Sequence, residues 1–149
     1  MSLAMSRSER EAFLADLHVG VIAIAEEGRA PLAIPIWYAY EPGEEVRIVT
    51  GAGARKLELL RRAGRFSLCV QSEAPPYLYV SVEGPVVAIE AASLERDERP
   101  LAHRYLGPEL GDAYVAETSG SAGTAGGNML VRMKPQRWLS VDYRKQYGG

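Results

Sequence analysis

The sequence predicts a mainly β protein in which an antiparallel sheet closes into a small barrel and helices lie at its periphery. Its 149 residues suit a single domain, since domains usually hold roughly 100–200 residues. Five apolar segments of strand length occur before residue 91, and most are joined by turns of hairpin length. This spacing is typical of small antiparallel barrels. Helical patterns fall only at the start, in the middle and near the end, so the strand-helix alternation of a doubly wound α/β fold is missing.

Local patterns place the elements in order. Apolar periodicity separates helices from strands, and glycine, proline or capping residues mark the boundaries. Helices are expected over Ser8–Leu17, Arg55–Ala63, Leu94–Leu106 and Pro108–Glu117. Strands are expected over Val19–Ala25, Pro31–Tyr40, Val46–Thr50, Arg65–Gln71, Tyr77–Glu90 and Met129–Met133, while Trp138–Tyr143 is either a seventh strand or an extended tail.

The first helix is predicted from a capping box. The Ser8 hydroxyl can accept from the amide of Glu11, whose carboxylate reaches back to the helix start. The strands that follow are predicted from small and β-branched residues and from alternation of side chains. In the second strand this alternation puts Trp37 and Tyr38 on opposite faces.

Glycine and proline delimit the later elements. Gly64 is expected to end the second helix. The run Ser119–Gly127 is rich in Ser, Gly, Ala and Thr and is expected to be a mobile loop. Bends or breaks are expected at Gly84-Pro85 in the fifth strand and at Pro100 and Gly107 in the late helices.

One domain is expected over residues 6–149. Residues 1–5 end in a second start-like methionine, Met5, and are expected to be disordered or an added leader outside the fold. No apolar run approaches the ~18 residues of a membrane span. The N-terminus also lacks the basic-then-apolar pattern of a signal peptide. We therefore expect a cytoplasmic protein that binds no membrane.

Composition argues against several classes of protein. Seventeen basic and nineteen acidic residues give a net charge of −2, which disfavours a protein held to nucleic acid by overall basicity. The single cysteine excludes an intramolecular disulfide and a multi-cysteine zinc site. Cys69 is expected to be a small buried residue of the fourth strand. Two histidines, His18 and His103, cannot form a histidine-rich centre, so no metal is expected.

The most informative segment is a glycine-alanine loop between a strand and a helix. Val49 and Thr50 end the strand, and Gly51–Ala54 allows backbone amides to approach an anion closely. Arg55 and Lys56 then stand at the helix start, where cations are unfavourable by roughly 0.3–1 kcal/mol each. A bound phosphate would offset this cost. The same pattern also fits a plain strand-to-helix turn with two solvated basic residues, and it lacks the Walker signature.

With these motifs, Pro31–Val70 resembles the FMN-binding split-barrel superfamily of pyridoxamine 5′-phosphate oxidase-like proteins. The resemblance rests on the aromatic strand Ile34–Tyr38, the strand end with its small-residue loop and Arg-Lys pair, and the basic segment Arg61–Arg65. With weaker agreement through Gly84 it spans about half the chain. It implies a six-stranded antiparallel split β-barrel of Greek-key type that forms a homodimer.

The resemblance further implies a cofactor, FMN or the deazaflavin coenzyme F-420, in a groove at the dimer interface. Ala54 stands where a serine is common, so one phosphate hydrogen bond is missing. Arg55–Arg65 holds five basic residues and one acid, and this local charge of +4 suits a phosphorylated cofactor. The implied cofactor-binding residues are Ile34, Pro35, Ile36 and Trp37 at the ring, Val49, Thr50, Ala54, Arg55 and Lys56 at the phosphate, and Tyr79 from across the dimer.

The implied activity is hydride transfer between the cofactor ring and a small organic substrate, with no residue assigned as acid or base. The tail Trp138–Lys145 lacks the Arg- and His-rich segment of true pyridoxine phosphate oxidases, so that reaction is not expected. The Pro-Ile-Trp-Tyr strand and the Trp138 and Asp142 pattern look more like the actinobacterial branch, many of whose members use F-420.

Two other functions stay open at this stage. The same groove could hold FMN or a deazaflavin in a non-catalytic carrier or storage protein. Haem binding is less favoured, because His18 and His103 lie outside the expected barrel strands.

Overall fold

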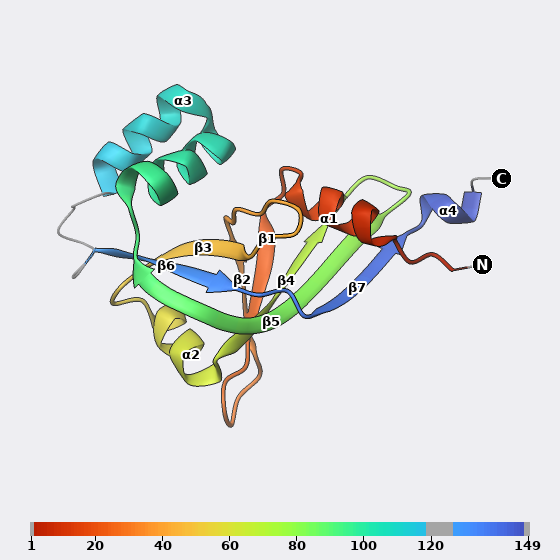
Figure 1. The fold of residues 1–149 in the computed structure, drawn as a ribbon, viewed down its shortest axis with the longest axis horizontal. Coiled ribbons are helices and arrows are strands. Elements are labelled where there is room, and N and C mark those ends of the chain that lie inside the picture. Colours follow the sequence, from red (N-terminus) through yellow and green to blue (C-terminus); the bar gives the residue numbers. More distant parts are fainter. Residues whose placement is uncertain (1, 119–126, 148–149) are drawn as a thin grey trace.

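The computed structural model describes residues 2–118 and 127–147. It confirms a mainly β fold with helices at the periphery of one curled sheet (Figure 1). The strands are β1 (Gly20–Ile24), β2 (Leu32–Ile36), β3 (Val46–Gly51), β4 (Arg65–Gln71), β5 (Leu78–Ala91), β6 (Asn128–Met133) and β7 (Arg137–Asp142). The helices are α1 (Arg7–Ala15), α2 (Arg55–Ala63), the π-helical turn η1 (Leu94–Glu98), α3 (Arg99–Thr118) and α4 (Arg144–Tyr147).

The strands form an antiparallel sheet in the order β2-β1-β4-β5-β6-β3, and β7 pairs with β5 beside this path. The consecutive strands β4, β5 and β6 are neighbours, and β3 returns to lie beside β6, which is Greek-key order. The described residues therefore contain seven strands where the split-barrel expectation had six. The additional strand is β7, the segment left open between a strand and a tail.

Strand β5 is long and bent, and its two halves therefore pair with different strands. Its first half pairs with β4 and β7, and its second half pairs with β6 after a register shift between Val86 and Ala88. At Gly84 an added Cβ would lie 1.8 Å from the carbonyl oxygen of Lys134, so only glycine fits. The predicted irregularity at this point is confirmed.

One isolated bridge links the two ends of the strand path. Ala39, just after β2, exchanges backbone hydrogen bonds of 2.9 Å with Arg47 of β3. This link joins the chain after the end of β2 to the start of β3.

The first helix begins earlier than predicted. Ser6, not Ser8, is the N-cap: its hydroxyl accepts from the Glu9 amide at 3.2 Å, and the Glu9 carboxylate accepts from the Ser6 amide at 2.7 Å. Both serines fit the capping-box pattern, but Glu11 pairs with Arg7 at 3.5 Å and does not cap.

Residues 2–5 take part in the fold, which differs from the expectation that residues 1–5 stand outside it. Met5 is buried in the core, and its amide donates to Ser140 Oγ at 3.0 Å. The carbonyl of Leu3 accepts from the amide of Asp142 at 2.8 Å. The start of the chain is thereby held against β7.

Alternation along the strands sets the core. In β4, Leu68 and Val70 are buried while Cys69 between them faces outward and is exposed, so the prediction of a buried cysteine is wrong. In the chain after β2, Tyr38 is fully buried and Trp37 faces the other side, as predicted.

The predicted ends of α2 and the predicted break at Gly107 are confirmed, whereas the predicted break at Pro100 is wrong, because α3 follows η1 directly and the chain stays helical through Pro100. Helix α2 spans the predicted residues and ends at Gly64, which adopts the left-handed conformation with φ of 70°. Helix α3 is kinked at Gly107, with φ of 81°, and begins one residue before Pro100. The predicted mobile loop lies outside the described residues except for Gly127. No described helix is long and apolar enough to cross a membrane.

Candidate functional site

A pocket of about 480 Å³ lies where the ends of β2 and β3 meet the start of α2, and α3 forms its opposite wall. Its volume is in the range typical of small-molecule sites. Seven of the predicted cofactor-binding residues line this pocket together: Pro35, Ile36, Trp37, Val49, Thr50, Ala54 and Lys56.

Lys56 is the basic side chain of this pocket. It lies in the first turn of α2 and is half-buried. Burial lowers the pKa of its ammonium group from the ordinary value, because desolvation disfavours the charged form. Within residues 2–118 and 127–147, Lys56 makes no hydrogen bond or ion pair. Its charge is therefore available to an anion in the pocket.

The start of α2 adds backbone donors beside this lysine. The N-cap is Ala54, which supplies no side-chain hydrogen bond to the first turn. The first amides of a helix have no intrahelical partner and carry partial positive charge. A Cβ built on Gly53 would meet no atom of residues 2–118 and 127–147 within 4 Å, so no described residue blocks the approach to these amides. Among the described residues, this arrangement suits a phosphate group.

Trp37 forms the aromatic wall of the pocket and is held by α3. Its ring stacks on Tyr105 with centroids 4.9 Å apart and planes 4° from parallel, and it meets Tyr114 at 5.3 Å. The Tyr105 hydroxyl donates to the carbonyl of His18 at 2.6 Å and accepts from the Tyr38 amide at 3.1 Å. These contacts fix the orientation of Trp37 before any ligand binds.

Three predicted residues do not lie in this pocket. Arg55 is more than half exposed and forms an ion pair with Glu26 of the β1–β2 turn. Ile34 packs against the core. Tyr79 lies on the outer face of β5, in register with Gln71 of β4 and Val141 of β7.

The sequence does not predict the α3 wall. It predicts helices at the periphery, and the structure shows that one of them, in the insertion between β5 and β6, covers the pocket. Aromatic residues in α3 were the available signal, but only the folded chain shows that they contact Trp37. The additional lining residues are Gly51, Glu98, Leu101, Ala102, Tyr114, Val115, Thr118 and Asn128.

His103 and Asp142 lie outside this pocket. His103 Nε2 lies 2.7 Å from Asp112 Oδ1 at a partly exposed position. Asp142 is buried and accepts two side-chain hydrogen bonds from Arg144, at 2.9 and 3.0 Å. In the part of the chain that is described, no group of three or more His, Cys, Asp or Glu residues could hold a metal ion.

The fold defines a split-barrel protein, and the pocket is its candidate ligand site. The family model of pyridoxamine 5′-phosphate oxidase matches residues 6–142, and the chain belongs to this family. The resemblance found in the sequence is thereby confirmed. No curated protein is similar enough in sequence to count as a relative.

Solved structures with the same fold include proteins with different ligands. The conserved hypothetical protein Rv2991 from Mycobacterium tuberculosis is 25% identical, with a TM-score of 0.78 over 99% of this chain and 91% of its own. An F420 reductase is 20% identical, with a TM-score of 0.61 over 87% and 94% of the two chains. A FAD-binding protein from Mesorhizobium loti is 19% identical, with a TM-score of 0.64 over 92% and 94%.

Proposed function

We propose that this protein is an oxidoreductase that binds FMN or F-420 in the pocket beside α2 and transfers hydride to or from a small organic substrate. The observation that carries the proposal is the position of Lys56. Its ammonium is half-buried without a partner among the described residues, at an uncapped helix start, in the same pocket as Pro35 and Trp37. Lys56 and the start of α2 can therefore hold a phosphate, while Pro35 and Trp37 hold a planar ring beside it.

The chain's own residues bind and orient. Lys56 and the first amides of α2 hold the phosphate, with Thr50 buried at the adjacent strand end. The segment Pro35–Trp37 positions the ring, and α3 shields it from water. The bound flavin or deazaflavin supplies the hydride chemistry, while the protein supplies position and electrostatics.

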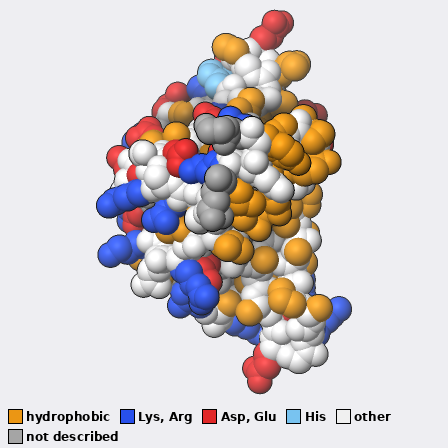
Figure 2. Space-filling model, turned by 90° about the vertical axis from the view of Figure 1, so that its right-hand side faces the viewer, with side chains coloured by type: hydrophobic (Ala, Val, Ile, Leu, Met, Phe, Trp, Pro, Cys, Tyr) orange, Lys and Arg blue, Asp and Glu red, His pale blue; other side chains and the backbone are white. Residues whose placement is uncertain are grey.

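A second copy of the chain is part of the proposal. The outer sheet face carries a row in register across β1, β4, β5 and β7, from Val21 through Cys69 and Ser81 to Leu139. Val21 is 42% exposed and Leu139 is 60% exposed. Figure 2 views the end of the molecule that carries both termini and shows hydrophobic side chains gathered along one side and Lys and Arg along the other. We expect the outer face around Val21 and Leu139 to pair with a second copy, which would bring Tyr79 of one copy toward the cofactor of the other.

The haem alternative gains no support from the pocket. His18 Nε2 lies 2.9 Å from the carbonyl of Phe13, and His103 contacts Asp112. Neither imidazole lines the pocket beside α2. A carrier or storage protein for the same cofactors differs from the proposed enzyme only in turnover.

The test is a titration of the purified protein with FMN and with F-420, followed by absorbance and fluorescence. Saturable binding of either cofactor at micromolar concentration is expected, followed by oxidation of the bound reduced cofactor when organic acceptors are added. Binding without turnover by any acceptor would favour the carrier. Failure to bind either cofactor would overturn the proposed site.

A further inference from the structure

A second pocket, of about 320 Å³, lies next to the cofactor pocket along β3. Arg47 and Val49 are on the same face of the strand because side chains alternate. Val49 and Leu101 of α3 line both pockets, so they form a shared wall. Three arginines line the second pocket, which we call the arginine pocket: Arg47, Arg96 and Arg104.

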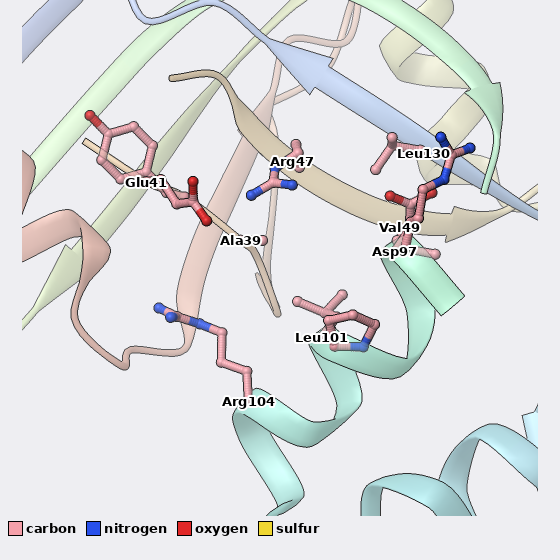
Figure 3. A pocket seen from close by; sticks show the side chains of 11 residues that line it. Ala39, Glu41, Arg47, Val49, Asp97, Leu101, Arg104 and Leu130 are labelled. Atoms are coloured by element: carbon pink, nitrogen blue, oxygen red, sulfur yellow. The ribbon is translucent and has the colours of Figure 1, made fainter. Parts of the chain in front are cut away.

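Two of these arginines have unsatisfied donors at buried positions. The Nε atoms of Arg47 and Arg104 are both buried without a hydrogen-bond partner among the described residues. Figure 3 shows both side chains reaching toward the space beside Ala39 from opposite sides, Arg47 from β3 and Arg104 from α3. A buried donor without a partner is costly, and an anion bound between the two guanidinium groups would satisfy both.

Arg104 is held in place by the protein. Its terminal nitrogen donates to the carbonyl of Asp16 at 2.7 Å and to that of Ala15 at 3.2 Å. The guanidinium carbon also lies 5.5 Å from the centre of the Tyr38 ring. A fixed guanidinium loses little conformational freedom when it binds an anion, which favours binding.

The charges in the pocket are not balanced by its acids. Asp97 and Glu41 are the two carboxylates that line it, against three arginines. Asp97 accepts a hydrogen bond from the amide of Ser93 at 2.7 Å. Glu41 is exposed and makes no side-chain hydrogen bond or ion pair within the described residues. Arg47 likewise has no ion pair there, so a net positive charge faces the pocket.

We propose that the arginine pocket binds the carboxylate or phosphate of an organic anion, and that this anion is the substrate of the reaction in the neighbouring pocket. The second half of this inference rests on the proposed function. Apolar walls from Ala39, Pro100 and Leu130 suit the body of such a molecule. Arg47 lies two residues from Val49, about 7 Å along the strand, so a single-ring acid reaches from the guanidinium to the shared wall.

The experiment uses benzoate and phenyl phosphate as probes and benzamide as their uncharged counterpart, with binding followed by ligand-observed NMR. The wild-type protein is expected to bind at least one of the two anions at least fivefold more tightly than benzamide. Arg47→Gln should remove this preference, whereas Arg29→Gln, in an exposed turn and in the lining of neither pocket, should keep it. Glu41→Gln should tighten anion binding, because it removes a carboxylate from the pocket. Preference for benzoate over phenyl phosphate, or the reverse, identifies the anionic group.

Equal binding of all three probes to the wild type, or an unchanged preference in Arg47→Gln, would overturn the arginine pocket as an anion site. Cofactor titration of the same proteins separates the two proposals. A protein that binds the anion but neither FMN nor F-420 would refute the proposed function and keep the anion site. A protein that binds a cofactor but shows no anion preference would refute only the anion site in the arginine pocket.

Discussion

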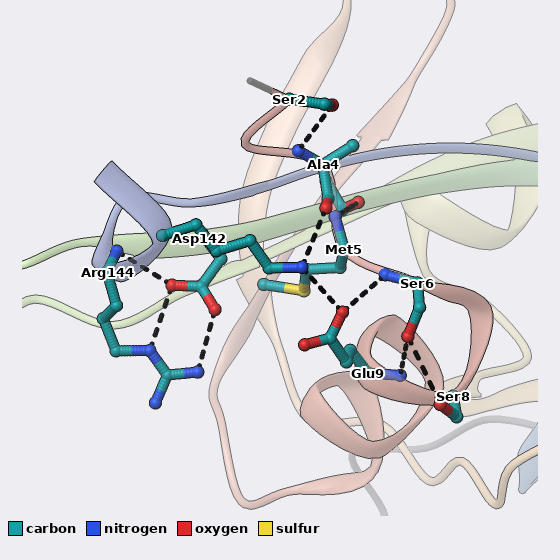
Figure 4. A network of polar contacts seen from close by, with 10 residues as sticks. Ser2, Ala4, Met5, Ser6, Ser8, Glu9, Asp142 and Arg144 are labelled. Atoms are coloured by element: carbon teal, nitrogen blue, oxygen red, sulfur yellow. Dashed lines mark hydrogen bonds and ion pairs between the residues drawn. The ribbon is translucent and has the colours of Figure 1, made fainter. Parts of the chain in front are cut away.

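Glu9 Oε1 accepts a hydrogen bond from Lys145 Nζ at 2.8 Å and so connects α1 to α4 (Figure 4). The same oxygen accepts from the Ser6 amide at the helix cap. The hydrogen bond from Lys145, followed by those from Ser6, lowers the pKa of Glu9 to about 2. One carboxylate therefore serves both the start of the first helix and the contact between the two ends of the chain.

This pairing predicts a pH-dependent contribution to stability. The folded pKa of Glu9 lies below its ordinary value of 4.5, so the contribution is complete above about pH 4.5 and is lost as pH falls toward 2. Glu9→Gln should lower the unfolding temperature at pH 7, and the difference from wild type should shrink steadily between pH 4.5 and 2. Thermal unfolding measured by circular dichroism across this range tests it. Glu73→Gln, at an exposed position, is the control, and a difference independent of pH would contradict the prediction.

Lys56 and Arg55 are adjacent in sequence, but we expect their substitutions to have different effects on cofactor binding. Lys56 lines the pocket, while Arg55 is paired with Glu26 outside it. A hydrogen bond to a charged group contributes about 1.5–3 kcal/mol, so Lys56→Ala should weaken cofactor binding by roughly tenfold to a hundredfold. Arg55→Ala should weaken it by less than about threefold. The affinities come from fluorescence titration, with Lys134→Ala as the control, and equal losses for both variants would contradict this assignment.

The sequence predicted those features that depend on neighbouring residues. Gly64 fixed the end of α2 correctly because a glycine in the left-handed conformation is a local requirement. The capping box was placed at Ser8 because two serines satisfy the same pattern, and only tertiary contacts choose Ser6. Alternation puts Cys69 on the face opposite Leu68, and this pattern decides its exposure although a cysteine is usually a buried residue.

The parts of the site that could not be predicted depend on residues distant in sequence. Trp37 meets Tyr105 only because the α3 insertion folds over the end of β2. Arg47 and Arg104 line one pocket although fifty-six positions separate them in the chain. Neither contact follows from a periodic pattern or a fixed spacing in the sequence. The strand that carries Pro35–Trp37 is therefore recognisable from the sequence, whereas the α3 wall and the arginine pocket are not.

If the outer sheet face forms the dimer interface, one charged substitution on this face should disrupt the dimer. Leu139 is 60% exposed on this face, in register with Ser81 of β5. Burying an aspartate against a second copy is costly when it has no partner. Light scattering at micromolar concentration should therefore report a dimer for the wild type and a monomer for Leu139→Asp. Leu110→Asp, at a similarly exposed position in α3, should remain dimeric. A monomeric wild type would contradict the shared groove.

An added methyl group at Gly84 is expected to destabilise the fold. Its Cβ would lie 1.8 Å from a backbone oxygen, that of Lys134, and a backbone atom cannot rotate away as a side chain does. Overpacking commonly costs about 1–3 kcal/mol. Gly84→Ala should therefore lower the free energy of unfolding by at least about 2 kcal/mol. It should also move the bend of β5 away from the chain that follows β6. Gly53→Ala is the matched variant, because its Cβ would meet no atom of the described residues within 4 Å, and a change within about 0.5 kcal/mol is expected. Urea unfolding of both proteins provides the comparison. Similar losses in the two variants would show that the close approach at Gly84 does not shape the sheet.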